Sequence, residues 1–317
     1  MYKIAIIEEF HKSGLKLFDK HKNFKYEIIN DVSENNLINE LPKFDGCTLR
    51  VSKLTKKILE KCEKLKVISR HGVGYDNVDL DFIKKRKISL LITANQNDIT
   101  VAEHAMYMML SLSKGVVSHD IAVRKGLFKK GIKNIQTFDL NEKKMLIIGF
   151  GRVGKSMIQK CNSFNMNVKV YDPFVKREII EENAAKKLEN LQDGLKNADF
   201  VSLHVPLTDK TKNLINLNNL KTMKKTAIII NTSRGGVINE LDLNKALIEN
   251  MIFGAGIDVF EKEPVTKNNP LIKNKKILLS PHSATFTNEC KIRMAKQTVK
   301  NIIDFFEKKI DKSMVIN

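Results

Sequence analysis

The sequence has 317 residues, 42% of them hydrophobic, which is enough for more than one core and favours two domains. No apolar run approaches the ~20 residues of a membrane span, so we expect no membrane contact. The formal net charge is +19, but the lysines are dispersed, without long blocks or interleaved aromatic residues. This pattern favours solvated helix faces over a nucleic-acid-binding surface, although the field would attract anionic substrates.

The N-terminus and the cysteines bear on location. Met1–Glu8 is predicted as a first strand and not a signal peptide, because Glu8 interrupts the apolar segment and no cleavage site follows. The four cysteines have no metal-binding or C-x-x-C spacing. We therefore expect reduced thiols, no metal ion and a cytoplasmic protein.

From Met1 to about Asn97, short apolar runs alternate with segments of helical spacing. The expected strands are Lys3–Ile7, Lys25–Ile29, Cys47–Val51, Lys66–Ser69 and Ser89–Thr93, and the expected helices lie near Ser13–His21, Glu34–Leu41, Thr55–Lys64 and Leu80–Lys85. This alternation predicts a parallel sheet with helices on both faces. No glycine fingerprint follows the first strand, so we do not expect this part to bind a dinucleotide.

A glycine-bearing turn, Arg70–Asp79, follows one of these strands. Its backbone N–H groups could form a nest for an anion, with Arg70 beside it. A turn that simply needs positive φ angles explains the glycines equally well.

The segment from Ile99 to Leu112 is apolar nearly all round. Such a helix is expected to be buried, either between domains or against another subunit. We interpret His104, inside it, as a packing histidine. The following segment, Lys125–Asn141, is predicted to be rich in loops.

The residues Lys144–Lys155 carry the strongest signal in the chain. Four apolar residues predict a buried parallel strand, Gly151–Phe164 has helical spacing, and Gly149, Gly151 and Gly154 fit the dinucleotide fingerprint between them. The helix N-terminus would face the pyrophosphate. Asp172 ends the next strand, where an acid binds the ribose diol and repels a 2′-phosphate, so NAD is favoured over NADP.

After Asp172 the alternation resumes. The expected strands are Phe200–His204, Ala227–Asn231, Phe253–Asp258 and Lys276–Leu279, so that Lys144–Leu279 forms a second doubly wound domain. The last helix, Thr287–Lys309, is long and amphipathic, and we expect it to return to the first domain. The prediction is an α/β protein of two Rossmann-like doubly wound parallel-sheet domains with a cleft between them. Residues 1–98 with 286–317 would form a discontinuous, flavodoxin-like substrate-binding domain, and residues 99–285 the NAD-binding Rossmann domain.

Three strand ends of the second domain carry polar residues, where ligands of open α/β sheets bind. These segments are Asn231–Gly236, Asp258–Pro264 and Ser280–Ala284. Arg234 could grip a carboxylate, and His282 could take a hydroxyl proton with a carboxylate on its other ring nitrogen. Each also has a plain explanation: a surface ion pair for Arg234, a solvated turn for Glu263 and a structural role for His282.

The sequence resembles the D-isomer-specific 2-hydroxyacid dehydrogenases, and most closely the short D-3-phosphoglycerate dehydrogenases. The resemblance covers nearly the whole chain, through Arg70–Asp79, Val101–His104, the fingerprint with Asp172, His204–Thr208 and the three strand-end segments. It implies that Arg234, Glu263 and His282 are catalytic, and that the helix after Ile99 contributes to a homodimer. For the substrate it implies Arg70, the amides of Val73 and Gly74, and Asn95. For the cofactor it implies contacts from Thr93, Gly149, Gly151, Arg152, Val153, Gly154, Asp172, Val205, Pro206, Thr232, Ser233, Asp258, Ser283 and Ala284.

The expected reaction is hydride transfer between NAD and a small anionic D-2-hydroxy acid. The substrate we favour is 3-phosphoglycerate, which is oxidised to 3-phosphohydroxypyruvate in serine biosynthesis. Hydroxypyruvate, glyoxylate or another short 2-oxo acid is the alternative, and an NADH-sensing, corepressor-like binding protein is an alternative of another class. Two departures from the family matter. The chain ends at Asn317, so serine control through a C-terminal domain is not expected, and Ser283–Thr287 lacks the glycines common after the histidine.

Overall fold

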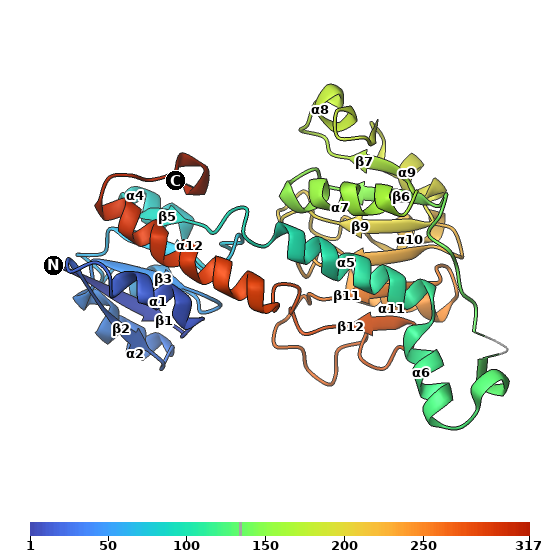
Figure 1. Ribbon diagram of the computed structural model, residues 1–317, viewed down its shortest axis with the longest axis horizontal. Helices are drawn as coiled ribbons and strands as arrows, with labels where there is room; N and C mark the ends of the chain where they lie inside the picture. The colour runs from blue at the N-terminus through green and yellow to red at the C-terminus, as the bar shows by residue number, and fades with distance from the viewer. Residues whose placement is uncertain (133–134) are drawn as a thin grey trace. The chain divides into compact units, whose positions relative to one another are not determined.

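The computed structural model describes residues 1–132 and 135–317 (Figure 1). They form two compact units: unit 1 comprises Met1–Asn97 and Thr285–Asn317, and unit 2 comprises Asp98–Ala284. The two boundaries between the units, after Asn97 and after Ala284, each lie one residue earlier than the boundaries expected from the sequence. Across the described residues, no helix has the length and apolar character needed to cross a bilayer.

Unit 1 is built on a five-stranded sheet with the order β2-β1-β3-β4-β5, paired in parallel throughout. Its strands are β1 (Tyr2–Ile7), β2 (Phe24–Ile29), β3 (Gly46–Leu49), β4 (Val67–Arg70) and β5 (Ser89–Leu91). This is the flavodoxin-like order of a doubly wound sheet. The parallel pairing follows from the sequence, because a helical segment after each short apolar strand brings the chain back to the end of the sheet at which the strand began.

Helices cover both faces of this sheet. They are α1 (Lys12–Phe18), α2 (Glu34–Glu40), α3 (Lys56–Leu59), α4 (Leu80–Lys85) and α12 (Asn288–Phe306). In β1, Ile4 and Ile6 pack with α1 and α12, whereas Ala5 and Ile7 pack in the core that includes α2, α3 and α4. Helix α12 lies beside α1 (Figure 1), so the C-terminal segment completes the core of unit 1 as expected.

Several helices of unit 1 are shorter than predicted, among them α1, which ends at Phe18 and not at His21. The expected helix Thr55–Lys64 is helical only in α3, because Lys61 N and Cys62 N bond to carbonyls three residues back and the chain continues as turns. Helix α12 starts after Thr287, whose hydroxyl caps it by accepting from Cys290 N. It ends before Lys308, which has a φ of +60°.

Unit 2 contains a seven-stranded parallel sheet with the order β12-β11-β10-β9-β6-β7-β8. Its strands are β6 (Lys144–Ile148), β7 (Asn167–Tyr171), β8 (Lys186–Leu188), β9 (Phe200–Leu203), β10 (Ile228–Asn231), β11 (Gly254–Ile257) and β12 (Ile277–Leu279). Counted from β6, this is the Rossmann order with one further strand, and β6 and β9 meet at the topological switch point. The predicted fold class is confirmed for both units.

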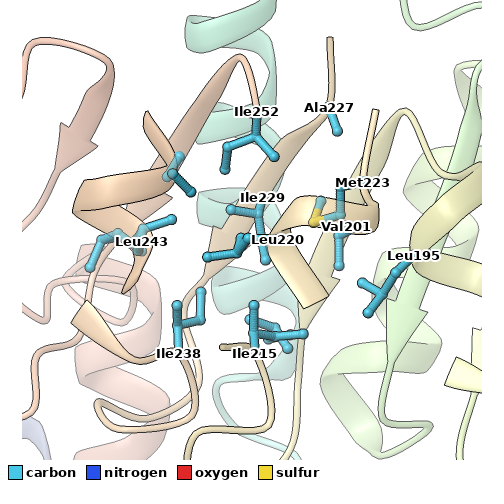
Figure 2. Close-up of a cluster of buried hydrophobic side chains, with 14 of the residues drawn as sticks. Leu195, Val201, Ile215, Leu220, Met223, Ala227, Ile229, Ile238, Leu243 and Ile252 are labelled. Carbon is cyan, nitrogen blue, oxygen red and sulfur yellow. The ribbon is translucent and has the colours of Figure 1, made fainter. Parts of the chain in front are cut away.

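Two hydrophobic clusters sandwich this sheet. One joins the sheet to α9 (Leu191–Asn197), α10 (Leu217–Thr222) and α11 (Glu240–Ile248) and is shown in part in Figure 2. The other joins the opposite face to α5 (Asp98–Ser113) and α7 (Arg152–Ser163). Because α5 packs against β10 and β11 as well as α7, most of its apolar surface is buried within unit 2 itself, while Ile99 and Tyr107 stay exposed.

The segment predicted to be rich in loops, Lys125–Asn141, has neither an α-helix nor a strand among its described residues. Helix α6 (Val116–Arg124) precedes it, and a short 3₁₀ turn, η2 (Phe128–Ile132), lies inside it. Helix α6 extends away from the sheet of unit 2 (Figure 1). Residues 133–134 of this segment lie outside the described residues. A short helix, α8 (Arg177–Glu181), follows β7.

Candidate active site at the carboxyl edge of the second sheet

The three fingerprint glycines fill three different spatial roles after β6. Gly149 has a φ of +99°, and a Cβ atom there would lie 2.4 Å from His204 O. A Cβ at Gly154 would lie 2.2 Å from Gly149 O, so helix α7 packs directly on the turn. At Gly151, by contrast, a Cβ would meet no atom within 4 Å. The close contacts require glycine, and the open side at Gly151 leaves room for a ligand at the start of α7.

Asp172 is tied to this loop by backbone hydrogen bonds. Its Oδ2 accepts from Phe150 N at 2.8 Å and its Oδ1 from Phe174 N at 2.9 Å. Its carboxylate is therefore fixed beside the glycine turn. Among the described residues, the buried hydroxyl of Thr232 after β10 has no hydrogen-bond partner. The open glycine loop, the fixed carboxylate and this orphaned hydroxyl all fit a dinucleotide.

Arg234 is presented by a tight turn after β10. The side chain of Asn231 organises this turn, because its Nδ2 donates to Arg234 O at 2.9 Å and its Oδ1 accepts from both the N and the Oγ of Ser233. Arg234 Nη1 donates to Ser233 O at 2.7 Å, and its side chain is half-buried. The guanidinium is thus held close to the end of the strand.

Glu263 and His282 come from the segments after β11 and β12. His282 Nδ1 lies 2.7 Å from Glu263 Oε2, and His282 N donates to Asp258 O at 2.8 Å. His282 has a φ of +51°, an unusual conformation for a non-glycine residue. Its imidazole is half-exposed, so the ring reaches solvent while its backbone is fixed.

The electrostatics tie all three side chains together. Burial acts to raise the pKa of Glu263, but hydrogen bonds from His282 and Phe260 N, with the charges of His282 and Arg234, outweigh it and hold that pKa below its ordinary value. Glu263 is therefore ionised near neutrality and accepts hydrogen bonds only. It follows that His282 Nδ1 carries the proton in this contact and that Nε2 is the basic nitrogen of the neutral ring.

Asp258 fixes the turn that contains His282. Its carboxylate is completely buried and accepts from Ser280 Oγ, Ser283 N and Ala284 N. His104 Nε2 lies 3.0 Å from Ser280 Oγ. Burial lowers the pKa of His104, and the charge of Asp258 opposes that effect only in part. The sequence suggested packing for His104 and missed this connection, which no local pattern signals.

The remaining predicted cofactor residues of unit 2 lie in the same loops. Arg152 and Val153 begin α7, and Val205 and Pro206 follow β9. The Val205 side chain packs against the position of Gly149. Ser233, Ser283 and Ala284 lie in the turns already described, so all predicted residues of unit 2 gather at the carboxyl edge of one sheet.

The other predicted residues belong to unit 1. Arg70 ends β4, and Val73 and Gly74 lie in the turn after it. Arg70 Nη1 donates to His71 O at 2.8 Å. Thr93 N donates to Gly72 O at 3.0 Å, which joins the end of β5 to the turn. Asn95 follows with a φ of +60°. The turn after β4 and the end of β5 therefore adjoin each other within unit 1.

Comparison with known proteins identifies this arrangement. Residues 106–284 match the model of the NAD-binding domain of D-isomer-specific 2-hydroxyacid dehydrogenases. The chain belongs to this family. The matched residues include the glycine loop, Asp172 and the three strand-end segments, so the resemblance noted from the motifs is confirmed. NAD, the cofactor expected from the fingerprint, is confirmed as well.

The relatives in the family differ in their named substrates. The chain is 33% identical to a glyoxylate reductase of Korarchaeum cryptofilum over 99% of its own length and 95% of that protein. It is 33% identical to a D-3-phosphoglycerate dehydrogenase of Methanocaldococcus jannaschii over 91% of its own length, but spans only 54% of that protein. The crystal structure of a D-lactate dehydrogenase of Aquifex aeolicus, complexed with NAD and lactic acid, superimposes with a TM-score of 0.87 at 28% identity, covering 99% of this chain and 98% of that one.

Proposed function

We propose that this chain catalyses NAD-dependent interconversion of a D-2-hydroxy acid and a 2-oxo acid, with Arg234, Glu263 and His282 as its catalytic residues. The observation that carries the proposal is the 2.7 Å contact between Glu263 Oε2 and His282 Nδ1 beside the Arg234 turn. These groups suit a reaction at C2 of a 2-hydroxy acid. An imidazole can transfer the hydroxyl proton, a protein carboxylate can orient that imidazole, and a guanidinium can bind the carboxylate of the substrate.

Each of the three residues has a distinct task. In the oxidation direction, His282 Nε2 accepts the proton of the 2-hydroxyl group, and in reduction it returns that proton to the carbonyl oxygen. Ionised Glu263 orients the ring through Nδ1 and stabilises the imidazolium. Arg234 binds the substrate carboxylate and polarises the 2-oxo group, where negative charge develops.

NAD, when bound, accepts or supplies the hydride at C2 of the acid. Gly149, Gly151, Arg152, Val153 and Gly154 would hold its pyrophosphate, and Asp172 its ribose diol. The rest of the nucleotide would contact a set of residues at the other strand ends and in unit 1: Thr93, Val205, Pro206, Thr232, Ser233, Asp258, Ser283 and Ala284.

We propose 3-phosphohydroxypyruvate as the 2-oxo acid, which would give the chain the phosphoglycerate dehydrogenase step of serine biosynthesis. The substrate residues would be Arg70, the Val73 and Gly74 amides, and Asn95. Arg70 beside a backbone anion turn, in a protein of net charge +19, favours an acid with a second anionic group.

Glyoxylate or hydroxypyruvate is the second candidate. Arg70 Nη1 already donates to the backbone oxygen of His71, and the chain covers nearly the whole of a glyoxylate reductase but about half of a phosphoglycerate dehydrogenase. Replacing Arg70 with Ala separates the two substrates. We expect kcat/KM to fall more for the phosphorylated acid than for glyoxylate. An equal fall for both would remove the phosphate argument.

The decisive experiment is NADH oxidation with a panel of 2-oxo acids, including 3-phosphohydroxypyruvate, hydroxypyruvate and glyoxylate. The variant His282→Ala should lower turnover by ~10² to 10⁴ with NADH affinity unchanged in a fluorescence titration. His119→Ala, at a partly buried histidine on α6 that lies outside the three strand-end segments, is the matched control and should keep its activity. If no acid is turned over although NADH binds tightly, an NADH-sensing role replaces the enzymatic one.

We also propose that the chain forms a homodimer through α5 and α6. Helix α6 exposes 52% of Val117 and 46% of Ile121, although both are apolar. Light scattering should give twice the chain mass of 36.2 kDa, and the double variant Val117→Asp, Ile121→Asp should give a monomer. Ile248→Asp, at an exposed apolar position on α11, is the control.

A further inference from the structure

Glu240 is a buried carboxylate that the proposed chemistry leaves unused. It is the first residue of α11 and only 9% exposed. Its Oε1 accepts from Glu261 N at 2.7 Å and its Oε2 from Asn269 Nδ2 at 2.6 Å. In return, Glu240 N donates to Glu261 Oε1 at 3.2 Å. The carboxylate thus joins the start of α11 to the segment that follows β11.

The peptide between Phe260 and Glu261 is held from two sides. Its N–H donates to Glu240. Its carbonyl packs on Gly235, where a Cβ atom would lie 1.9 Å from Phe260 O. Gly235 directly follows Arg234 in the chain, and Glu240 ends the same connection from β10 to α11. One peptide group therefore fixes the Arg234 turn and the Glu263 loop against each other.

The same loop sets the position of the Glu263 carboxylate. Phe260 N donates to Glu263 Oε1 at 3.0 Å, and Glu263 Oε2 contacts His282 Nδ1 at 2.7 Å. A shift of the Phe260 backbone would therefore be passed on to both oxygens of Glu263. Because an error of about 1 Å in a catalytic group can lower turnover about 10²-fold, the anchor of this peptide matters for catalysis.

We propose that Glu240 is a positioning residue for the dehydrogenase reaction: its carboxylate fixes the Phe260–Glu261 peptide, and through it the contact between Glu263 and His282. This inference rests on the proposed function. Glu240 touches neither substrate nor cofactor in this role. Replacing Glu240 should therefore change turnover and the hydrogen bond of His282 Nδ1–H to Glu263, and leave the affinity for NADH unchanged.

The neighbours of Glu240 allow three distinguishable variants. Glu240→Gln keeps an acceptor for Glu261 N but turns an amide donor toward Asn269 Nδ2. Asn269 cannot rotate its amide without cost, since its Oδ1 accepts from Leu271 N at 2.9 Å. Glu240→Asp keeps the charge but is shorter by about 1.5 Å, so it loses the contact with Glu261 N. Glu240→Ala loses both.

Asp242 offers a matched control on the same helix. Its Oδ2 accepts from Leu217 N at 2.9 Å, so it also anchors a backbone N–H with a carboxylate, but at the start of α10. Asp242→Ala therefore measures what the loss of such an anchor does to the protein away from the Glu263 loop.

The first measurement is steady-state kinetics with the best 2-oxo acid, together with NADH titrations. We expect kcat to fall about 100-fold in Glu240→Ala and Glu240→Asp, by less than about fivefold in Glu240→Gln, and to stay within twofold in Asp242→Ala. The NADH dissociation constant should stay within twofold throughout. An unchanged kcat in Glu240→Asp, or a loss confined to NADH affinity, would overturn the proposal.

The second measurement needs no turnover. The protein has seven histidines, and labelling them with ¹⁵N makes their ring N–H groups visible by NMR. The Nδ1–H of His282 should give a low-field proton resonance that disappears in Glu263→Gln. We expect it to weaken in Glu240→Ala and Glu240→Asp and to persist in Glu240→Gln and Asp242→Ala. If Glu240→Ala does not fold, Glu240→Asp decides. Should no acid be reduced, the proposed function fails, and this resonance still tests the role of Glu240.

Discussion

His71 should make unit 1 sensitive to acid. Its imidazole stacks on Phe10 with a centroid distance of 5.1 Å, and its Nδ1 lies 2.9 Å from Thr298 Oγ1. Burial, assisted by the charges of Arg50 and Arg70, lowers the pKa of His71 from 6.5 to about 3. The ring is therefore neutral in the folded protein throughout the physiological range.

The sign and size of the effect follow from proton linkage. Between pH 6.5 and about 3, the unfolded chain binds a proton at His71 that the folded protein does not bind. The free energy of unfolding therefore falls as the pH falls through this window. One pKa unit corresponds to about 1.4 kcal/mol, so two units below the unfolded pKa cost about 2.7 kcal/mol at pH 4.5.

The variant His71→Asn tests this value, because Asn can keep a polar contact with Thr298 but does not titrate. We expect the difference in free energy of unfolding between wild type and variant to change by about 2.7 kcal/mol, in favour of the variant, from pH 7.5 to 4.5. Hydrogen exchange of a peptide covering β4 measures it, with a peptide covering β6 as the internal control. A difference that does not depend on pH, or an equal change in β6, would refute the reasoning.

Three further substitutions test the candidate site. Gly235→Ala should lower turnover about 10²-fold, because the added Cβ atom would overlap Phe260 O. Gly236→Ala should mainly lower thermal stability, because the added Cβ atom would come no closer than 3.5 Å to any neighbouring atom. Equal losses of turnover in the two variants would contradict this reasoning. Asp172→Ala should narrow the preference for NADH over NADPH, measured as the ratio of dissociation constants, and a wild-type preference for NADPH would speak against the role of Asp172. Gly149→Ala, at a φ of +99°, should weaken NADH binding and lower the melting temperature together, and unchanged NADH affinity would count against the phosphate loop.

Most strands of the two sheets could be predicted because central parallel strands are buried on both faces and are therefore apolar without interruption. β6 and β10 are examples, and both were found within a residue of their expected bounds. The edge strand β8 was missed, because two of its three residues, Lys186 and Lys187, are charged. Helix ends were less certain. The end of α3 depends on a switch to turns, and the end of α12 on the φ angle of Lys308, and neither is encoded in hydrophobic periodicity.

The candidate site could also be predicted only in part: its residues could be named, but their contacts could not. Arg234, Glu263 and His282 could be proposed because strand ends and family motifs point to them. The contacts that hold them could not, because they join residues distant in sequence through backbone groups, as Glu240 does with Glu261 N. Ser280 and His104, 176 positions apart, are another such pair. The chemistry of these side chains is local, but their partners are fixed only by the tertiary fold.

The three catalytic candidates lie at the ends of different strands, so no single helix or loop sets their geometry. A parallel sheet fixes where β10, β11 and β12 end, but the loops beyond those ends remain free to move unless they are anchored to one another. Here the anchors are backbone groups: the Phe260–Glu261 peptide on Gly235 and Glu240, and the amides after His282 on Asp258. Because the loops are anchored through backbone groups, the side chains that face the ligand can differ between relatives without loss of these anchors. A relative could therefore change its acid substrate through residues of the loops while keeping the same proton-transfer geometry.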